Sequence, residues 1–207
     1  MRKLLSCLPA IFVALSASSQ WSLGAGVNYT HFNGREMMST STPGFHTRIL
    51  YQKGAYGVGL TYNYHLPFAV QNSMTLYTPP NSWGSAATEI QHRFQTLDIL
   101  IRRTILGDQQ SSGQLYGGMG ASWVRLSYKE KYMETYTLEP MFDLAKGNRS
   151  GFTANGLLGG ALKLGYISLY GEATYSLPRT VWAIKDSYYI TPSRLGFQLG
   201  VKLPLNP

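Results

Sequence analysis

The segment at residues 21–30 reads Trp21-Ser22-Leu23-Gly24-Ala25-Gly26-Val27-Asn28-Tyr29-Thr30 and alternates between two classes of side chain. Its odd-numbered positions are apolar or aromatic, while its even-numbered positions are Ser, Gly, Asn or Thr. Successive side chains of a β-strand point to opposite faces, whereas those of an α-helix repeat every 3.6 residues. Ten residues of period two therefore predict a strand with one apolar face and one small or polar face.

The same alternation recurs along the rest of the chain and predicts eight strands in total. Consecutive strands joined by short turns pair antiparallel, and Lys53-Gly54-Ala55 has the length of such a tight hairpin. The expected strands are residues 21–30, 45–52, 56–65, 94–106, 114–129, 155–164, 167–176 and 195–205.

The alternation changes phase inside residues 114–129. Leu115 and Trp123 share one face of this strand, whereas Val124 and Leu126 then continue the apolar pattern on the other face. An extra residue in one strand produces such a shift, so the pattern predicts either a β-bulge near Trp123 or a misjudged phase.

The connections between these strands alternate between long and short. In an up-and-down antiparallel sheet every second connection lies at the same end, so all the long loops share one end. The pattern predicts an all-β fold, namely an eight-stranded antiparallel up-and-down transmembrane β-barrel with short periplasmic turns and long extracellular loops. The long connections are residues 33–43, 67–93, 130–151 and 178–193; the short ones are residues 53–55, 107–113 and 165–166.

The composition of the polar face indicates which side of the barrel it occupies. A soluble lipocalin-like barrel has a wet, highly charged exterior, whereas here the polar face is mainly Gly, Ser, Thr and Asn with a few charges. Small residues and opposed charges suit the interior of an eight-stranded barrel, which side chains fill. We therefore expect a polar lumen network in which Asp98 and Glu172 bond to some of the cations, its members being Arg48, Asp98, Arg102, Lys163, Glu172 and Lys202.

The N-terminal residues predict export. Arg2 and Lys3 precede an apolar run at residues 4–17, and small residues follow, which together predict a signal peptide at residues 1–19. Residues 20–207 then form a single barrel domain that lacks cysteine, because Cys7 lies in the signal peptide. Only 14% of the chain is charged, against roughly 25% in soluble domains. We expect location in the cell outer membrane.

With its signal peptide, eight strands and alternating final segment at residues 195–205, the chain resembles the small Gram-negative outer-membrane β-barrel proteins, the OmpA/OmpX-like group often called the porin family. The resemblance implies assembly by the barrel-assembly machinery and a non-enzymatic, structural or surface-binding role. One feature departs from the family, because Leu205 stands where a terminal aromatic residue is usual, and Asn206-Pro207 follow it.

The net positive charge of the chain indicates which partners it could bind. The formal charge of +8 falls to +6 when Arg2 and Lys3 leave with the signal peptide. Guanidinium groups match phosphate oxygens, so we expect outer-membrane lipid and lipopolysaccharide to contact cations near the long loops, unless nearby glutamates neutralise that rim. The long loops are also candidate binding sites for a surface partner, whereas export argues against nucleic acid. The candidate lipopolysaccharide contacts are Arg93, Arg125, Lys129, Arg179 and Arg194.

Other functions remain open at this stage. A lipid-modifying enzyme would need a nucleophile, a base and an orienting carboxylate, for which His65 with Ser73 or Ser82 and Glu89 is the best available set. A narrow pore and a soluble lipocalin-like binder are further alternatives. We expect no cofactor and no metal, although three histidines could converge on an ion near the long-loop end, namely His46, His65 and His92.

Overall fold

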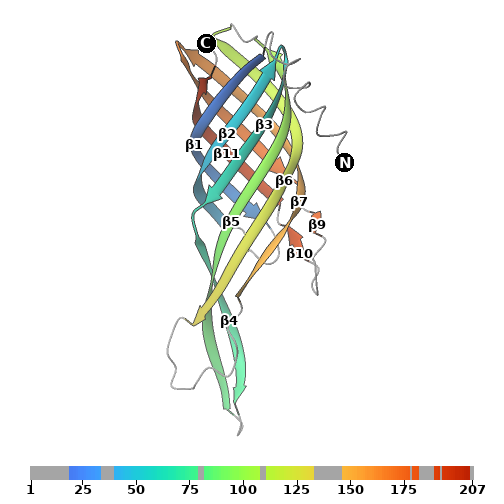
Figure 1. Cartoon of the computed structure of the whole chain (residues 1–207). Coiled ribbons are helices and arrows are strands. Elements are labelled where there is room, and N and C mark those ends of the chain that lie inside the picture. Colours follow the sequence, from blue (N-terminus) through green and yellow to red (C-terminus); the bar gives the residue numbers. More distant parts are fainter. Residues whose placement is uncertain are drawn as a thin grey trace, which may run out of the picture.

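The computed structural model of the chain is built from β-strands (Figure 1). It describes residues 19–33, 40–78, 82–107, 111–132, 146–177, 179–181, 189–191 and 193–205, so residues 1–18 of the predicted signal peptide lie outside the described part. The strands are β1 (Ser19–Asn33), β2 (Thr40–Lys53), β3 (Tyr56–His65), β4 (Phe68–Thr78), β5 (Ser82–Leu106), β6 (Gly113–Tyr132), β7 (Lys146–Leu164), β8 (Ile167–Ser176), β9 (Arg179–Val181), β10 (Tyr189–Thr191) and β11 (Ser193–Pro204).

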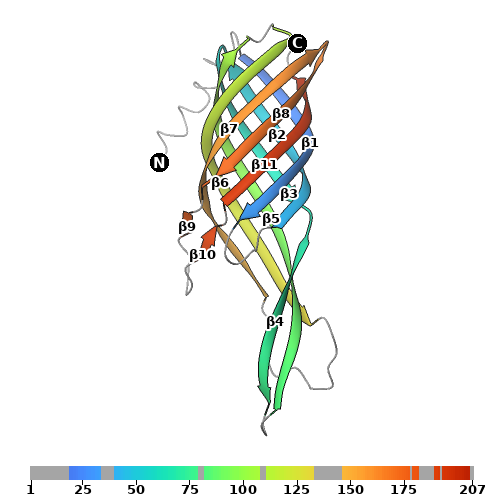
Figure 2. The same ribbon diagram turned by 180° about the vertical axis from the view of Figure 1, so that it is seen from behind.

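Eight of these strands close into an antiparallel barrel, as predicted (Figures 1 and 2). The order around the barrel is β3-β2-β1-β11-β8-β7-β6-β5, and pairing between β3 and β5 completes the ring. Ser22 of β1 faces Pro204 of β11 at the end that also carries the turn after Lys53. The start of β1, the end of β11 and the short turns therefore share one end of the barrel, which we call the turn end. The opposite end is the loop end.

The predicted long loops contain additional strands. Residues 67–93 were expected to be a loop, but β4 occupies Phe68–Thr78 and pairs with the first part of a 25-residue β5. β6 and β7 also extend into the expected loop at residues 130–151, and β9 pairs with β10 inside residues 178–193. These strands reach beyond the barrel at the loop end (Figure 2). Cross-strand pairing satisfies the backbone groups of these extensions, so the strands continue past the closed barrel.

The predicted bulge near Trp123 is absent from the described pairing. β5 and β6 keep one register from Thr88↔Tyr132 to Thr104↔Tyr116, and the shift lies between Thr104 and Leu106. Val124 and Leu126 are buried in the lumen, whereas Trp123 faces outward. The structure therefore supports the other alternative, a misjudged phase: the strand keeps one phase, and Val124 and Leu126 belong to an apolar cluster inside the lumen.

The two faces of the barrel wall differ sharply. The outward face exposes large apolar side chains on each barrel strand, for example Val27 on β1, Met119 on β6 at 73% exposure and Leu199 on β11 at 64%. Gln198, the residue just before Leu199 on β11, is only 6% exposed. No helix among the described residues is long and apolar enough to cross a membrane.

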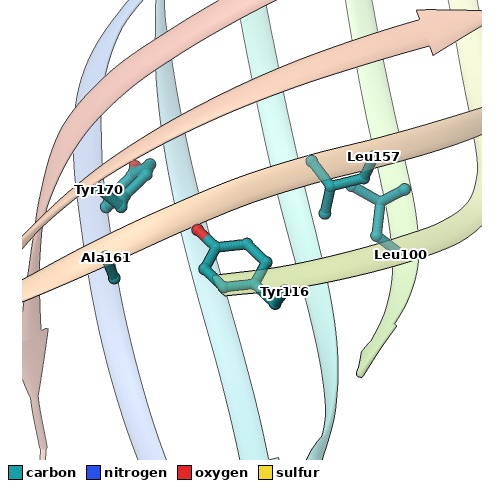
Figure 3. Packing of buried hydrophobic residues seen from close by; sticks show 5 residues of the cluster. All are labelled: Leu100, Tyr116, Leu157, Ala161 and Tyr170. Atoms are coloured by element: carbon teal, nitrogen blue, oxygen red, sulfur yellow. The ribbon is translucent and has the colours of Figure 1, made fainter. Parts of the chain in front are cut away.

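Two clusters of buried apolar and aromatic side chains, which we call the apolar layers, lie inside the lumen. One layer contains Leu100, Tyr116, Leu157, Ala161 and Tyr170, whose side chains project inward from four strands (Figure 3). The second layer lies toward the loop end of the lumen, and partly buried Phe68 packs against it. Its members are Phe32, Phe94, Val124 and Leu126.

Candidate functional site

A buried ion pair occupies the middle of the lumen. The Arg48 guanidinium on β2 donates to both carboxylate oxygens of Glu172 on β8 through its two terminal nitrogens. The Tyr116 hydroxyl donates to Glu172 Oε1 at 2.7 Å, and Arg48 Nη2 also donates to Gln198 Oε1 at 2.9 Å. The Tyr170 ring lies 4.5 Å from the guanidinium carbon of Arg48. Four strands thus hold one carboxylate and one guanidinium with their main bonding groups satisfied.

Arg102 lies beside this ion pair without a carboxylate of its own. Its Nη2 donates to Gln52 Oε1 at 2.9 Å, and its guanidinium carbon lies 4.5 Å from the centroid of the Tyr116 ring. Among the described residues its Nε has no hydrogen-bond partner. A guanidinium group over an aromatic face is partly compensated by the ring quadrupole. The middle of the lumen therefore contains one more buried cation than buried carboxylates.

A network of amide and hydroxyl groups fills the next layer toward the loop end. Asn63 Nδ2 donates to Asp98 Oδ2 at 2.8 Å and to Thr96 Oγ1 at 3.0 Å. Asn63 Oδ1 accepts from Asn28 Nδ2 at 3.1 Å and from Gln198 Nε2 at 3.0 Å. These bonds join β1, β3, β5 and β11 across the lumen. Shared hydrogen bonds of this kind rigidify a buried polar core.

Arg194 lies between this network and the apolar layer of the loop end. It is buried, lies 5.4 Å from the centroid of the Phe94 ring, and lines a polar cavity of about 20 Å³ together with Asp98 and His65. Another cavity, of about 10 Å³, lies beside Arg48. Each of these volumes holds roughly one or two water molecules. Side chains and small cavities therefore fill the described lumen.

The predicted lumen residues divide into two groups. Arg48, Asp98, Arg102 and Glu172 are buried inside the barrel, Lys202 is partly buried at the turn end, and Lys163 is exposed there. Asp98 was expected to bond to a cation, but within the described residues it accepts from Asn63 and Ser122 instead. Hydroxyl and amide donors on neighbouring strands reach this carboxylate because they lie at the same level of the wall, which the sequence pattern alone does not reveal.

The candidate lipopolysaccharide contacts also divide. Arg93, Arg125 and Lys129 are exposed near the loop end, whereas Arg194 was placed wrongly, because its parity on β11 directs it into the lumen. The side chain of Arg179 lies outside the described part. Strand pairing brings Lys131 and Lys146 to the same outward face. We call Arg93, Arg125, Lys129, Lys131 and Lys146 the basic rim.

Cross-strand pairing concentrates positive charge in this basic rim. Lys129 on β6 stands directly opposite Lys146 on β7, and like charges in such a position repel. Glu89, which is opposite Lys131, is the acid nearest in register on this face, and within the described residues no rim cation forms an ion pair. Arg125 lies two residues beyond the outward pair Trp123 and Phe152, about 7 Å along the strands, whereas Lys129 and Lys146 lie six residues beyond that pair, about 20 Å along the strands.

The three histidines do not form a metal site. His46 Nε2 bonds the Tyr170 hydroxyl at 2.5 Å, whereas His65 packs edge-on against Phe94 and His92 stacks on Phe68. The described part of the chain contains no group of three or more His, Cys, Asp or Glu side chains that could hold a metal ion.

The candidate enzyme residues are also separated. His65 is buried among aromatic rings in the lumen, while Glu89 is on the outward-facing side of β5 and accepts from Gln91 Nε2 at 2.9 Å. The side chains of Ser73 and Ser82 lie outside the described part. The described residues therefore do not assemble the proposed base and carboxylate.

Sequence reasoning missed several residues of the site. Tyr116 and Tyr170 complete the ion-pair layer, and Lys146 joins the basic rim. The signal for Tyr170 was present, because it shares the inward parity of Glu172 two residues later. Lys146 gave no such signal, since its position depends on the register between β6 and β7.

Comparison with solved structures identifies the same architecture elsewhere. The crystal structure of Neisserial surface protein A matches with 13% sequence identity and a TM-score of 0.50, covering 90% of this chain and 99% of that chain. The N-terminal β-barrel domain of Pseudomonas aeruginosa OprF matches with 9% identity and a TM-score of 0.52, covering 91% and 100%. No protein-family model and no curated protein matches the chain. The chain thus has the closed fold of the eight-stranded outer-membrane β-barrels, as its resemblance to that group predicted.

Proposed function

We propose that the mature chain is an integral protein of the outer membrane, with a lumen filled by side chains and a non-enzymatic role at the cell surface. The observation that carries this proposal is the continuous apolar outward face around a closed barrel with a polar interior. Soluble monomers rarely expose apolar patches larger than a few hundred Å². In a bilayer the same face is buried in hydrocarbon, and closure leaves no unpaired strand edge within the barrel wall.

The proposed orientation places the turn end in the periplasm and the loop end outside the cell. Outer-membrane barrels generally have short periplasmic turns and longer extracellular connections. The hairpin of β4 and β5 and the extended ends of β6 and β7 would then project outward from the membrane (Figure 1). This is the part of the molecule in which we expect any surface partner to bind.

Reconstitution tests location and closure together. The protein, refolded without the predicted signal peptide, should partition into membranes or detergent and migrate differently in SDS gels before and after heating. In planar bilayers it should give no conductance above background. A soluble, detergent-independent protein would support the lipocalin-like alternative, and reproducible single-channel steps would support the narrow pore.

We further propose that the basic rim binds the phosphate groups of lipopolysaccharide. Arg125 follows directly after the aromatic pair Trp123 and Phe152, and the rim lysines lie further out along the same strands, which is the order expected where an apolar belt meets charged headgroups. Arg125 and Arg93 offer planar donor forks that suit phosphate oxygens. An anion between Lys129 and Lys146 would also relieve their repulsion.

Charge removal tests this proposal. The double variant Arg125→Gln with Lys129→Gln should bind lipopolysaccharide at least tenfold more weakly in detergent, since each charge-assisted contact contributes about 1.5–3 kcal/mol. Arg103→Gln with Lys53→Gln removes the same charge at the turn end and should leave binding unchanged. Equal losses in both double variants would indicate only a general effect of net charge and would refute a specific rim site.

A non-enzymatic role is part of the proposal. It is supported by the separation of His65 in the lumen from Glu89 on the outer face. Expression of the protein should leave the masses of lipid A and phospholipids unchanged. A new acylated or deacylated species, absent when a matched empty vector is expressed, would support the lipid-modifying alternative.

A further inference from the structure

The turn end of the lumen opens into a polar cavity that is separate from the basic rim at the other end. The cavity has a volume of about 40 Å³, and we call it the turn-end cup. Charged, amide and hydroxyl groups dominate its lining, which includes Gln20, Ser22, Gln52, Lys163, Ser168 and Lys202. These residues come from β1, β2, β7, β8 and β11, so barrel closure itself brings them together.

Positive charge accumulates at this cup without a matching acid. Lys163 and Lys202 line it, and no carboxylate does so among the described residues. Buried Arg102 lies behind Gln52, whose Oε1 accepts its hydrogen bond, and no described residue bonds to Arg102 Nε. The carboxylate of the adjoining layer, Glu172, is already engaged by Arg48 and Tyr116.

The lysines are held close together by the barrel wall. Lys163 and Lys202 are both Cα partners of Ser168, which lies between them on β8. Lys202 is also partly buried, so water screens its charge less than it screens a fully exposed lysine. Two nearby ammonium groups in a partly enclosed site favour an anion between them.

We propose that the turn-end cup binds a compact oxyanion, namely a phosphate or carboxylate group. The ammonium groups of Lys163 and Lys202 supply charge, while Ser168 and Ser22 supply hydroxyl donors. A volume of about 40 Å³ has room for roughly three water-sized atoms, which fits the oxygens of either group. The inference does not depend on the membrane location, although in the proposed orientation the cup faces the periplasm.

The test uses the refolded barrel in uncharged detergent micelles, so that lipid phosphate is absent. Inorganic phosphate and acetate are titrated separately at constant ionic strength against chloride, and the side-chain ammonium resonances of Lys163 and Lys202 are followed by NMR. We expect saturable shifts with at least one of the two probes. Saturation by phosphate alone assigns a phosphate group, by acetate alone a carboxylate group, and by both the oxyanion class they share.

Matched lysine variants decide whether the cup is the site. Lys202→Met and, separately, Lys163→Met should each weaken anion binding about tenfold, because each removes one charge-assisted contact. Lys53→Met removes an exposed lysine at the same end, outside the cup, and should leave affinity unchanged. Heat-modifiable migration confirms that each variant is folded. Shifts that never saturate with either probe, or an equal loss in Lys53→Met, would overturn the proposal.

Discussion

Glu172 accepts hydrogen bonds from Arg48 and Tyr116 deep in the lumen, so a single neutral substitution should have a large effect. In Glu172→Gln the Arg48 guanidinium becomes an uncompensated buried cation. We expect the free energy of unfolding to fall by about 3–5 kcal/mol. Urea unfolding in lipid vesicles, followed by tryptophan fluorescence, measures the change.

A double variant that replaces both members of the ion pair provides the control. Arg48→Met combined with Glu172→Leu removes both charges and fills similar volume, so most of the lost stability should return. A double variant as unstable as Glu172→Gln would contradict the assignment of the loss to an unpaired charge.

Gly200 makes room for a tyrosine ring inside the barrel. A Cβ atom at this position would lie 2.6 Å from Cζ of Tyr170 and 2.6 Å from the carbonyl oxygen of Ala25. Gly200→Ala should therefore lower the free energy of unfolding by about 1–3 kcal/mol through overpacking. Gly156→Ala is the matched control, because nothing lies within 4 Å of a Cβ there, and it should change stability by less than about 0.5 kcal/mol. Similar losses in both variants would contradict the steric explanation.

At the residue scale, parity along a strand predicts which face a side chain occupies but not which partner it contacts. Alternation placed Glu172 and Arg48 on one face, and the structure brings them together. It could not show that Asp98 would bond to Asn63, because that contact depends on the pairing and register of β3 with β5, which β4 separates in sequence.

The hairpin formed by β4 and the first part of β5 stands outside the closed ring. β3 pairs directly with β5 as far as Tyr64↔Gln95, so barrel closure does not use β4. Replacing residues 70–90 by a short Gly-Asn turn should leave a folded, heat-modifiable barrel, since Phe68 and its packing against the lumen are kept. Gel migration and circular dichroism measure this. Loss of the folded species would show that the hairpin is required for the barrel.

At the element scale, the existence of the barrel strands was predictable, whereas the ends of some strands were not. Period two identified all eight barrel strands because each has one face toward the polar lumen and an outward face of large apolar side chains. Residues 68–78 also alternate, with Phe68, Val70, Met74 and Leu76 in one phase. Because they lie inside a long connection between two predicted strands, they were assigned to a loop. Where strands keep pairing beyond the closed barrel, the sequence shows no sharp change of composition at which a strand must end.

If the apolar outward face of the barrel lies in a bilayer, the stability lost when an outward residue is replaced by arginine should depend strongly on its depth. Leu199 is near the middle of β11 and faces outward, so Leu199→Arg should lower the free energy of unfolding in vesicles by about 2–4 kcal/mol. Gln95 stands directly opposite rim residue Arg125, so Gln95→Arg should lower the free energy of unfolding by only about 0–1 kcal/mol. Equal effects at both positions in a vesicle-based unfolding titration would contradict this depth profile.

At the scale of the whole molecule, the alternation of long and short connections sufficed to predict an up-and-down barrel. The two apolar layers inside the lumen were not predictable from the sequence. A tyrosine or leucine at an inward position breaks the rule that apolar residues face outward, and only the alignment of neighbouring strands shows that such residues pack together inside. The basic rim depends on the registers among β5, β6 and β7. The turn-end cup arises only when the pairing of β1 with β11 brings β1, β2, β7, β8 and β11 together.

The central claim is that leucine, valine and aromatic rows face hydrocarbon while amide and ionic groups occupy the interior. It is tested most directly by placing a single cysteine at Leu199 or at Gln198 in the refolded protein in lipid vesicles. A spin label at residue 199 should collide readily with oxygen and rarely with a polar nickel chelate, and a cysteine at residue 198 should resist a bulky maleimide until the barrel is unfolded. Nickel access at residue 199 together with rapid labelling at residue 198 in the folded protein would contradict the account.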